Sequence, residues 1–317
     1  MKKVQIALFS LLALAAFTVG CGDSKLPVFK QMAFLSNRTS TPQTPVFLMN
    51  VDGSNVTPVP VTGEDVYSPS VSADLKTLAF TSDGNVWVSD AAGSTQTQLT
   101  TTGENYEAKL SPDGTSIVMD QWDSTPSNYD IWVMKNDGTG ALNLTTSLTN
   151  STTGCYSGSF SADSKKIVFS CYTEASTSIY TINPDGTGLA TIYTQNDYCD
   201  TPVFSPDGKQ IFFVSFGVPA PNGHKRALPA IRRFRGAGIK ANDATTYGVV
   251  SINSDGSNLS TLVVGAYETE ILNNSLYYTL YNTDLETSQI FMSNLDGSNA
   301  VALTDGTSYS YLGTSTD

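Results

Sequence analysis

Residues 111–145 read SPDGTSIVMDQWDSTPSNYDIWVMKNDGTGALNLT, and this stretch decides the fold. A Ser-Pro-Asp-Gly turn at 111–114 precedes one apolar run, and a second apolar run at 131–134 ends shortly before the turn Asp137-Gly138. Aspartate and glycine favour tight turns, while Ile, Val and Trp favour strands. The stretch therefore predicts antiparallel strands joined by short turns.

The same pattern recurs six times along the chain. Its most regular position is the glycine of the later turn, which returns at intervals of 40, 45, 48, 70 and 41 residues, with apolar residues six positions before and after it. Repeats of this length are typical of propellers and solenoids, in which each repeat is one supersecondary unit. These glycines are Gly53, Gly93, Gly138, Gly186, Gly256 and Gly297.

Each unit also carries an earlier turn, usually Ser-x-Asp, between a short strand and an apolar run. A complete unit therefore has four predicted strands, which we name A to D in chain order. The sixth unit departs from the pattern, because Asn273 and Asn274 replace its earlier turn. The predicted units are 30–61 plus the C-terminal tail, 66–100, 106–145, 155–194, 199–264 and 267–304.

The two chain ends are predicted to share one unit. The first unit begins at its second strand, 32–36, and the chain continues beyond the last strand of the sixth unit with the segment 308–312. If this segment supplies the missing inner strand, the ring closes and no sheet edge is left unpaired. The sequence thus predicts an all-β, six-bladed β-propeller of four-stranded antiparallel blades, closed by the C-terminal strand completing blade one.

The order Ser-Pro-Asp-Gly, strand, Ile-Trp-Val-Met-x-x-Asp-Gly, Leu-Thr resembles the repeat of the TolB-like β-propeller family. The resemblance covers almost all of 29–317 and implies the propeller fold. TolB also has a separate α/β domain before its propeller, for which residues 22–29 leave no room, so the partner-binding role of that domain does not carry over. Peptidase members of the family add a Gly-x-Ser-x-Gly elbow, which the sequence lacks.

The N-terminus is predicted to direct export. Lys2 and Lys3 precede the apolar run 4–19, which suits a signal peptide better than a membrane span. Gly20-Cys21 resembles the lipobox of bacterial lipoproteins, which implies a lipid on Cys21; ordinary signal cleavage, leaving a plain thiol, is the alternative. We expect a signal peptide (1–20), a lipid-anchored tether (21–28) and a single propeller domain (29–317) in the bacterial cell envelope, facing the periplasm or the exterior.

Composition excludes several functions. With 17 Lys and Arg against 29 Asp and Glu, the net charge is −12, which disfavours binding to nucleic acid phosphates. The chain has a single histidine, His224, so chemistry that requires two imidazoles is excluded. No motif indicates a metal or cofactor, and we expect none. The aspartates of the Ser-x-Asp turns are interpreted as acceptors of backbone hydrogen bonds.

One column of residues is a candidate ligand site. In most units this position holds a tyrosine, five residues before the serine of the earlier turn. The column lies where the inner strands begin, so its residues should ring one mouth of the central channel. Two interpretations stand: the tyrosines pack between blades, or they line an acidic pocket that stacks on a sugar or holds a peptide or a cation. The column comprises Tyr67, Tyr106, Tyr156, Asp200, Tyr267 and Tyr309, and the neighbouring carboxylates include Glu64, Glu104 and Glu268, with Asp65, Glu107, Asp197 and Glu270 nearby.

Blade five carries an insertion, 217–247, between strands B and C. It contains six cations and should emerge beside the acidic mouth, either as a lid or as a surface loop, with a reading-frame error as a third explanation. Three cysteines follow Cys21. Cys155 and Cys171 should face each other across one hairpin, so we predict a disulfide between them and a free Cys199.

Together these features favour a monomeric, non-catalytic binding or scaffold protein that uses a propeller face to bind an envelope protein, a peptide or a glycan. The alternative is a carbohydrate-active enzyme, a glycoside hydrolase or lyase, with two carboxylates at the channel mouth. A buried carboxyl pair with one raised pKa would favour the enzyme, and a wide, shallow mouth would favour protein binding.

Overall fold

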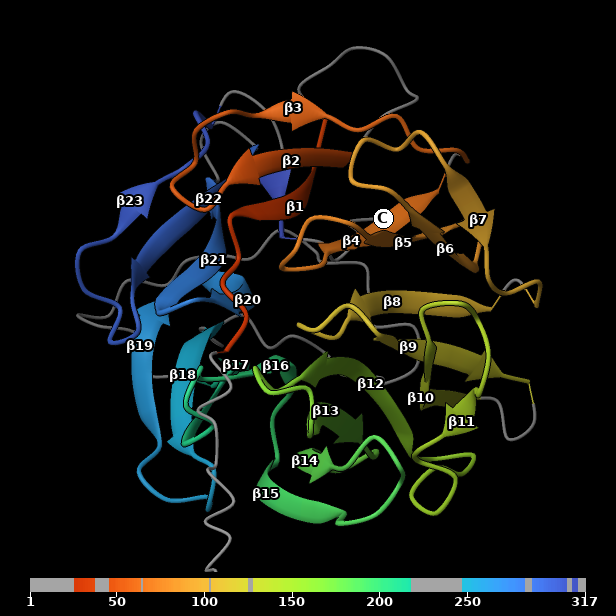
Figure 1. The fold of residues 1–317 in the computed structure, drawn as a ribbon. Helices are drawn as coiled ribbons and strands as arrows, with labels where there is room; N and C mark the ends of the chain where they lie inside the picture. The colour runs from red at the N-terminus through yellow and green to blue at the C-terminus, as the bar shows by residue number, and fades with distance from the viewer. Residues whose placement is uncertain are drawn as a thin grey trace, which may run out of the picture.

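The computed structural model is a ring of six antiparallel sheets around a central axis, which confirms the predicted fold (Figure 1). Each sheet has four strands, and no helix occurs among the described residues. The blade boundaries agree with the predicted units to within about three residues, as expected for boundaries read from sequence. The structure describes residues 26–37, 46–63, 65–102, 104–124, 128–217, 247–282, 287–306 and 310–312.

The first three blades follow one another around the ring, with strand A innermost. Blade one is β24 (Ser310–Tyr311), β1 (Gln31–Ser36), β2 (Val46–Asn50) and β3 (Thr57–Pro58); blade two is β4 (Val66–Val71), β5 (Leu78–Ser82), β6 (Asn85–Ser89) and β7 (Gln96–Gln98); blade three is β8 (Asn105–Leu110), β9 (Ser116–Asp123), β10 (Asn128–Lys135) and β11 (Leu142–Asn143).

The remaining blades repeat this order. Blade four is β12 (Gly154–Phe160), β13 (Ile167–Tyr172), β14 (Thr177–Ile182) and β15 (Ala190–Gln195); blade five is β16 (Cys199–Phe204), β17 (Gln210–Phe216), β18 (Tyr247–Asn253) and β19 (Ser260–Val264); blade six is β20 (Ala266–Leu272), β21 (Ser275–Asn282), β22 (Thr287–Asn294) and β23 (Val301–Ala302).

The C-terminal strand completes blade one, as predicted. Strand β24 pairs antiparallel with β1, and Ser310 lies opposite Ser36. Their hydroxyl oxygens are 3.1 Å apart in a buried contact. The ring is therefore closed by residues from both ends of the described chain, and the inner edge of β1 is covered.

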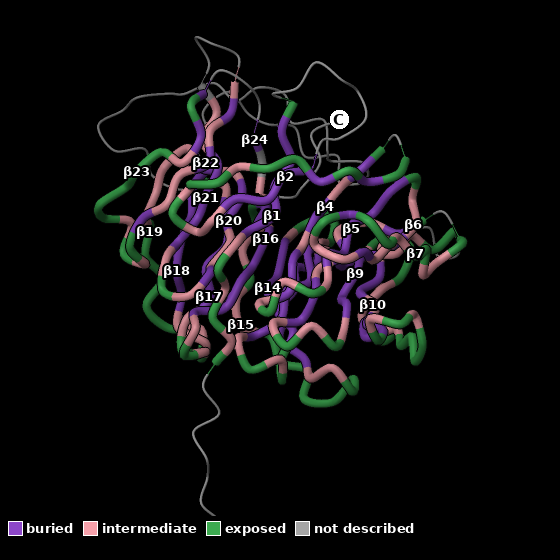
Figure 2. The backbone as a smooth tube through the Cα atoms, turned by 45° about the horizontal axis from the view of Figure 1, so that its top comes forward, coloured by how far each residue is buried: buried purple, intermediate pink, exposed green. Residues whose placement is uncertain are grey.

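The hydrophobic core lies between adjacent blades. Every residue of strand B in blade two, β5, is buried, because both faces of an inner strand pack against neighbouring sheets. The outer D strands β7 and β15 are largely exposed. Figure 2 shows this gradient, with buried segments in the interior of the ring and exposed segments at the turns and outer strands.

The turns behave as the sequence predicts. The six repeated glycines have φ between 72° and 85°, a left-handed conformation that side chains with a Cβ rarely adopt. In the earlier turn of blade three, Asp113 accepts hydrogen bonds from the Ser111 hydroxyl (2.6 Å) and the Thr115 backbone N–H (3.0 Å). The corresponding Asp74, Asp163 and Asp207 make the same pair of bonds, which confirms their structural interpretation.

Two further sequence features can be located. Cys155 and Cys171 form a disulfide between paired positions of β12 and β13, and Cys199 is a buried free thiol. Among the described residues, no helix has the length and apolar character needed to cross a membrane.

Candidate functional site

Bulges in the inner strands turn polar residues into the central channel. The pairing of strand A with strand B shifts register at the same position in blades two to five, and one residue earlier in blade six. An extra residue at a bulge rotates the side chains that follow it, and a positive φ is one way to accommodate it. In four blades the residue at the bulge has φ between 43° and 58°: Ser68, Glu107, Ser157 and Thr201.

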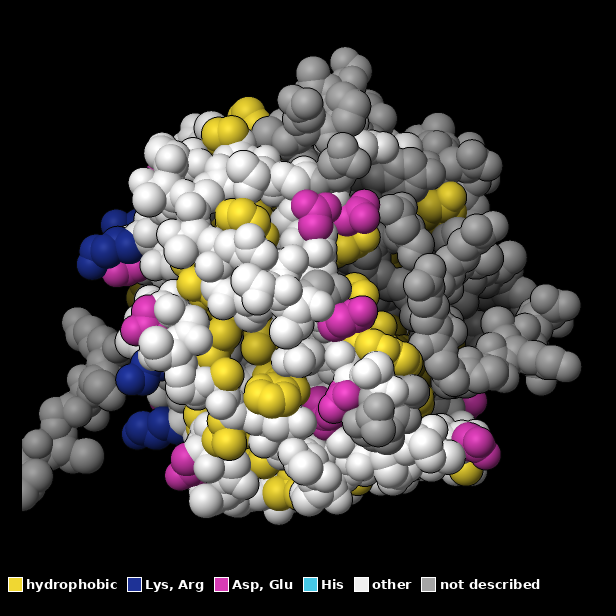
Figure 3. All heavy atoms as spheres, turned by 90° about the vertical axis from the view of Figure 1, so that its right-hand side faces the viewer, with side chains coloured by type: hydrophobic (Ala, Val, Ile, Leu, Met, Phe, Trp, Pro, Cys, Tyr) yellow, Lys and Arg dark blue, Asp and Glu magenta, His cyan; other side chains and the backbone are white. Residues whose placement is uncertain are grey.

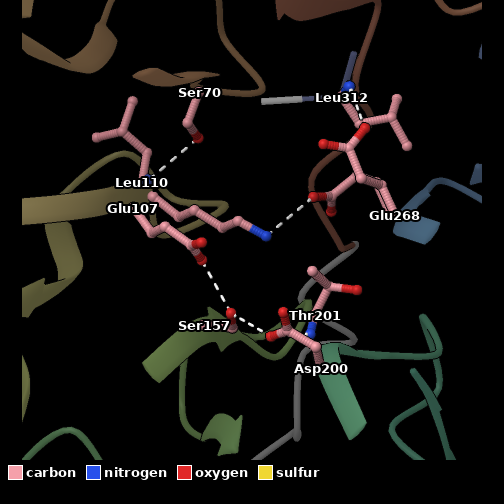
Figure 4. A network of polar contacts seen from close by, with 10 residues as sticks. Ser70, Glu107, Leu110, Ser157, Asp200, Thr201, Glu268 and Leu312 are labelled. Atoms are coloured by element: carbon pink, nitrogen blue, oxygen red, sulfur yellow. Dashed lines mark hydrogen bonds and ion pairs between the residues drawn. The ribbon is translucent and has the colours of Figure 1, made fainter. Parts of the chain in front are cut away.

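Three blades meet in one hydrogen-bonded cluster. Ser157 Oγ lies 2.9 Å from Glu107 Oε2 and 2.5 Å from Asp200 Oδ1, and Figure 4 shows the three side chains pointing toward one another. Asp200 is held in turn by the Thr201 backbone N–H (2.7 Å) and the Tyr198 hydroxyl (3.0 Å). We call Glu107, Ser157 and Asp200, together with Asp120, which accepts a hydrogen bond from the Ser157 backbone N–H, the acidic cluster.

The geometry of the acidic cluster suits a shared proton. A serine hydroxyl has one hydrogen, so both contacts of Ser157 are hydrogen bonds only when one of the two carboxyls is protonated. Burial and the charge of Glu107 raise the pKa of Asp200 to about 6. Burial and the charge of Glu107 also raise the pKa of Asp120 well above its ordinary value, although Asp120 Oδ2 accepts a 2.9 Å bond from the Ser157 backbone N–H.

A partly buried lysine lies beside the acidic cluster. Lys109 Nζ is 3.6 Å from Glu270 Oε2, and the two side chains are 17% and 26% exposed. Burial opposes the charged ammonium, but the charges of Glu270, Glu107 and Asp120 outweigh it and raise the pKa of Lys109. Lys109 is therefore a cation beside carboxyl groups from two blades, three and six.

Glu268, a predicted site residue, is part of the ring closure. Its side chain is 2% exposed, and Oε2 accepts hydrogen bonds from the Thr279 hydroxyl (2.7 Å) and the Leu312 backbone N–H (3.0 Å). Figure 4 shows Glu268 and Leu312 across the channel from the acidic cluster. The second bond ties β20 to the residue that follows β24, and the first joins β20 to β21.

The predicted tyrosine column lies in contacts between aromatic rings. Tyr156 stacks on Tyr198 with ring centroids 5.7 Å apart, and Tyr106 meets Tyr129 edge-on at 5.7 Å. Tyr267 donates a 2.8 Å hydrogen bond to the Ser288 hydroxyl. The tyrosines are half-buried, as are Tyr67 and Asp200. The structure thus places Asp200 in the acidic cluster, whereas Tyr106 and Tyr156 have ring contacts and Tyr267 has a hydroxyl contact within its own blade.

Of the remaining predicted residues, the structure describes Glu104 and leaves the others outside the described ranges. Glu104 is exposed just before β8. Glu64, Tyr309, Cys21 and the central part of the insertion, 218–246, lie outside the described residues, so the predicted lid and lipid anchor stay predictions.

The two faces of the ring differ in charge. We call the face with the A–B and C–D turns the A–B face, and the face with the B–C and D–A connections the D–A face. All exposed lysines of the described residues lie on the A–B face, together with the turn aspartates; Figure 3 shows lysines along one edge of the molecule. The described part of the D–A face has no Lys or Arg, and its exposed carboxylates are Asp65, Asp83, Glu104, Asp123, Glu174, Asp197 and Asp305.

A cavity of about 360 Å³ occupies the A–B end of the channel. The ends of the inner strands line it, and the N-terminal segment Leu26–Phe29 forms part of its wall. Asn273 holds this segment: its Oδ1 accepts from the Phe29 backbone N–H (2.9 Å), and its Nδ2 donates to the Phe29 carbonyl (3.0 Å). The departure from the turn pattern in blade six thus has a structural use.

The residue that follows the predicted column forms a second regular column, which the sequence analysis did not single out. In each of blades two to six, the residue after the predicted column is polar: Ser68, Glu107, Ser157, Thr201 and Glu268. That regularity is a signal for the bulge. Asp120 and Lys109 carry no such signal, because neither recurs in other blades. No group of three or more His, Cys, Asp or Glu side chains suited to a metal ion occurs among the residues the structure describes.

The comparisons with known proteins concern the fold. No protein-family model and no curated protein sequence matches the chain. A putative TolB from Agrobacterium tumefaciens aligns with a TM-score of 0.61 and 18% identity, over 81% of this chain and 92% of that one. TolB from Acinetobacter baumannii aligns with a TM-score of 0.64 and 17% identity, over 88% of this chain and 65%, just under two thirds, of that one.

A chain of the nidogen/laminin complex shares the architecture as well. It aligns with a TM-score of 0.60 and 14% identity, over 88% of this chain and 93% of that one. Identities this low show a shared fold and do not indicate a shared function, because one propeller fold hosts many unrelated functions. In fold, the chain is a TolB-like six-bladed β-propeller.

Proposed function

We propose that the protein is a monomeric, non-catalytic binding or scaffold protein of the bacterial envelope, attached to a membrane through lipid on Cys21. Its D–A face binds an envelope protein, a peptide or a glycan. The observation that carries this proposal is the chemistry of the D–A face. Exposed carboxylates lie there beside half-buried aromatic rings, and none of the described residues of this face is Lys or Arg.

Blade three gives the clearest example. Trp122 and Tyr129 meet edge-on with ring centroids 4.9 Å apart, and Tyr129 also contacts Tyr106. The exposed Glu104 and Asp123 flank these rings in the chain. Half-buried aromatic rings stack on sugar faces and on peptide side chains, and adjacent carboxylates bind hydroxyl groups or cations.

A binding experiment tests this assignment. The full protein and Trp122→Ala are applied to a glycan array and used as baits in envelope extract, with Leu142→Ala as the matched variant. Leu142 is 40% exposed on an outer strand, away from the D–A face. We expect Trp122→Ala to lose at least tenfold in affinity for the captured partner and Leu142→Ala to keep it. Equal binding by both variants would refute the D–A face as the site.

The location has its own test. Cys21→Ser removes the only residue that can carry the lipobox-type lipid, so this variant should leave the membrane pellet and appear in the soluble fraction. If Cys21→Ser stays in the pellet after a high-salt wash, the anchor is wrong.

A carbohydrate-active enzyme is the second candidate, and one observation favours it: Asp200 and Asp120 have raised pKa values beside Glu107. Against it, Ser157 bridges Glu107 and Asp200 directly, where a glycosidase places the scissile bond. None of the three carboxyls lines the A–B cavity. If purified protein releases reducing sugar from envelope glycans and Glu107→Gln abolishes this, the enzyme is correct.

A further inference from the structure

The cavity at the A–B end of the channel has the features of a second, separate binding site. Its volume of about 360 Å³ falls within the range of small-molecule sites, roughly 300–1,000 Å³. It opens at the opposite end of the channel from the D–A face, so it is independent of the proposed function. All inner strands from β4 to β20 contribute to its lining.

The walls of the cavity are apolar and stiff. They include Pro69, Pro112 and Pro206, together with Phe160 and Phe204. Proline and phenylalanine side chains have few rotatable bonds, so they lose little entropy when a ligand packs against them. Such walls suit a compact apolar body.

The charged groups that line the cavity are the ion pair of Lys109 and Glu270. Their 3.6 Å separation exceeds the 2.7–2.9 Å of a good charge-assisted hydrogen bond. An ammonium has three donors and a carboxylate about four acceptor positions, so this one long contact leaves hydrogen-bonding capacity on both partners. Both side chains line the cavity.

Ser68 is an independent indication of a ligand. It lines the same cavity and is 2% exposed, yet its hydroxyl has no hydrogen-bond partner in the structure. An unpaired buried hydroxyl costs about 1–3 kcal/mol. The bulge in β4 holds the Ser68 backbone at φ 47° beside the cavity, and rotation about the Cα–Cβ bond would bring the hydroxyl to the ligand.

Charge selects the kind of ligand. Glu107 and Asp120 lie close enough to Lys109 to act on its charge, so carboxyl groups exceed cations around the ion pair. An anionic head group would be repelled by this excess. A cationic head group would be attracted by it, but it has no acceptor for the Lys109 ammonium and would lie beside that like charge. A neutral group with one donor and one acceptor can bridge the two: its donor bonds Glu270, and its acceptor takes a hydrogen from Lys109.

We propose that the A–B cavity binds an uncharged ligand with a compact apolar body and a head group that is both donor and acceptor, of the primary carboxamide type. The head bridges Lys109 and Glu270 and reaches the Ser68 hydroxyl, and the body packs among the prolines. The N-terminal segment Leu26–Phe29 covers one side of the bound ligand.

A series of matched probes tests the head group. Hexanamide, hexanoate and hexylammonium share one apolar chain and differ only in the head, and their binding to the full protein is followed by protein-observed NMR at neutral pH. Hexanamide should bind at least tenfold more tightly than either charged probe. Equal or tighter binding of hexanoate or hexylammonium, or no binding of hexanamide, would overturn the proposal.

Two pairs of variants locate the site. Ala162 lies at the cavity in the earlier turn of blade four, and Ala73 is its counterpart in blade two, away from the cavity. Ala162→Phe should abolish hexanamide binding, and Ala73→Phe should preserve it. Ser68→Ala should weaken binding severalfold, whereas Ser170→Ala, which removes another buried and unpaired hydroxyl outside the cavity, should leave binding unchanged.

The paired design separates binding from folding. If Ala162→Phe fails to fold, Ser68→Ala with its Ser170→Ala control still decides the matter. Equal effects within the Ser pair, or binding that survives in a folded Ala162→Phe, would place hexanamide elsewhere and overturn the proposal.

Discussion

The backbone N–H of Leu312 donates a 3.0 Å hydrogen bond to the carboxylate of Glu268, which lies 44 residues earlier in the chain. Glu268 belongs to the inner strand of blade six, and Leu312 follows the strand that completes blade one. The closing strand β24 has only two residues. A side chain from the neighbouring blade therefore helps to hold the ring shut.

Replacement of Glu268 should loosen the closure. Glu268→Ala leaves the Leu312 N–H and the Thr279 hydroxyl without their acceptor, and each such loss costs about 1–3 kcal/mol. We expect the free energy of unfolding, measured in urea, to fall by about 2–4 kcal/mol. Glu104→Ala, at an exposed carboxylate, is the control. Equal stability of the two variants, or an unchanged melting temperature after deletion of 306–317, would contradict this role.

The acidic cluster should make stability depend on pH. Asp200 has a pKa raised from 3.8 to about 6, so between these values the folded state binds more protons than the unfolded state. Its stabilising contribution is therefore complete below pH 4 and is lost as the pH rises toward 6. Asp120 shifts in the same direction.

Asp200→Asn removes this titration. The stability of Asp200→Asn relative to the wild type should rise by about 2–3 kcal/mol between pH 4 and pH 6 and then stay level. The measurement is urea unfolding across this range, with Glu174→Gln as an exposed control. A difference that stays constant with pH would show that Asp200 titrates normally.

The disulfide should stabilise blade four. Cys155 and Cys171 are 16 residues apart, and cross-linking a loop of this size contributes about 3 kcal/mol in the chain-entropy account. The free energy of unfolding of the double variant Cys155→Ala, Cys171→Ala should be lower than that of the wild type by about 3 kcal/mol. Cys199→Ala is the matched variant, because it removes a buried thiol without breaking a cross-link. A larger loss of unfolding free energy in Cys199→Ala than in the double variant would mean that packing of the buried thiol stabilises the fold more than the cross-link does.

The native thiol of Cys199 should be unreactive. Burial raises its pKa, and only the thiolate reacts quickly with disulfide reagents. In the Cys21→Ser protein, labelling should begin only as the chain unfolds. Rapid labelling of the native form would indicate that blade five opens locally.

Asn273 should fix the N-terminal segment. Its φ is 55°, so Asn273→Gly keeps the backbone conformation at no steric cost while removing both side-chain bonds to Phe29. Proteolysis at Phe29 and Lys30 should become at least tenfold faster. Asn299→Gly, at φ 56° in an exposed turn, is the control. Equal cleavage in both variants would show that Asn273 does not hold the segment.

The sequence by itself determined the blades, their order and their closure. The turn glycines and the Ser-x-Asp turns act over four to six residues, and they recur, so each copy supports the interpretation of the others. The tail could be assigned to blade one because the first unit lacks its strand A and the segment 308–312 belongs to no other unit. Such inferences need only local turn chemistry and counting.

The tertiary structure alone decided which side chains meet. Glu107, Ser157 and Asp200 come from three blades and are 50 and 43 residues apart, and nothing in their spacing brings them together. The acidic cluster joins Asp200 of the predicted column to Glu107 and Ser157, each of which follows the column by one residue. A one-residue shift sends a side chain to the other face of a strand, so a repeat pattern predicts the strand while the backbone twist at each bulge decides where its residues point.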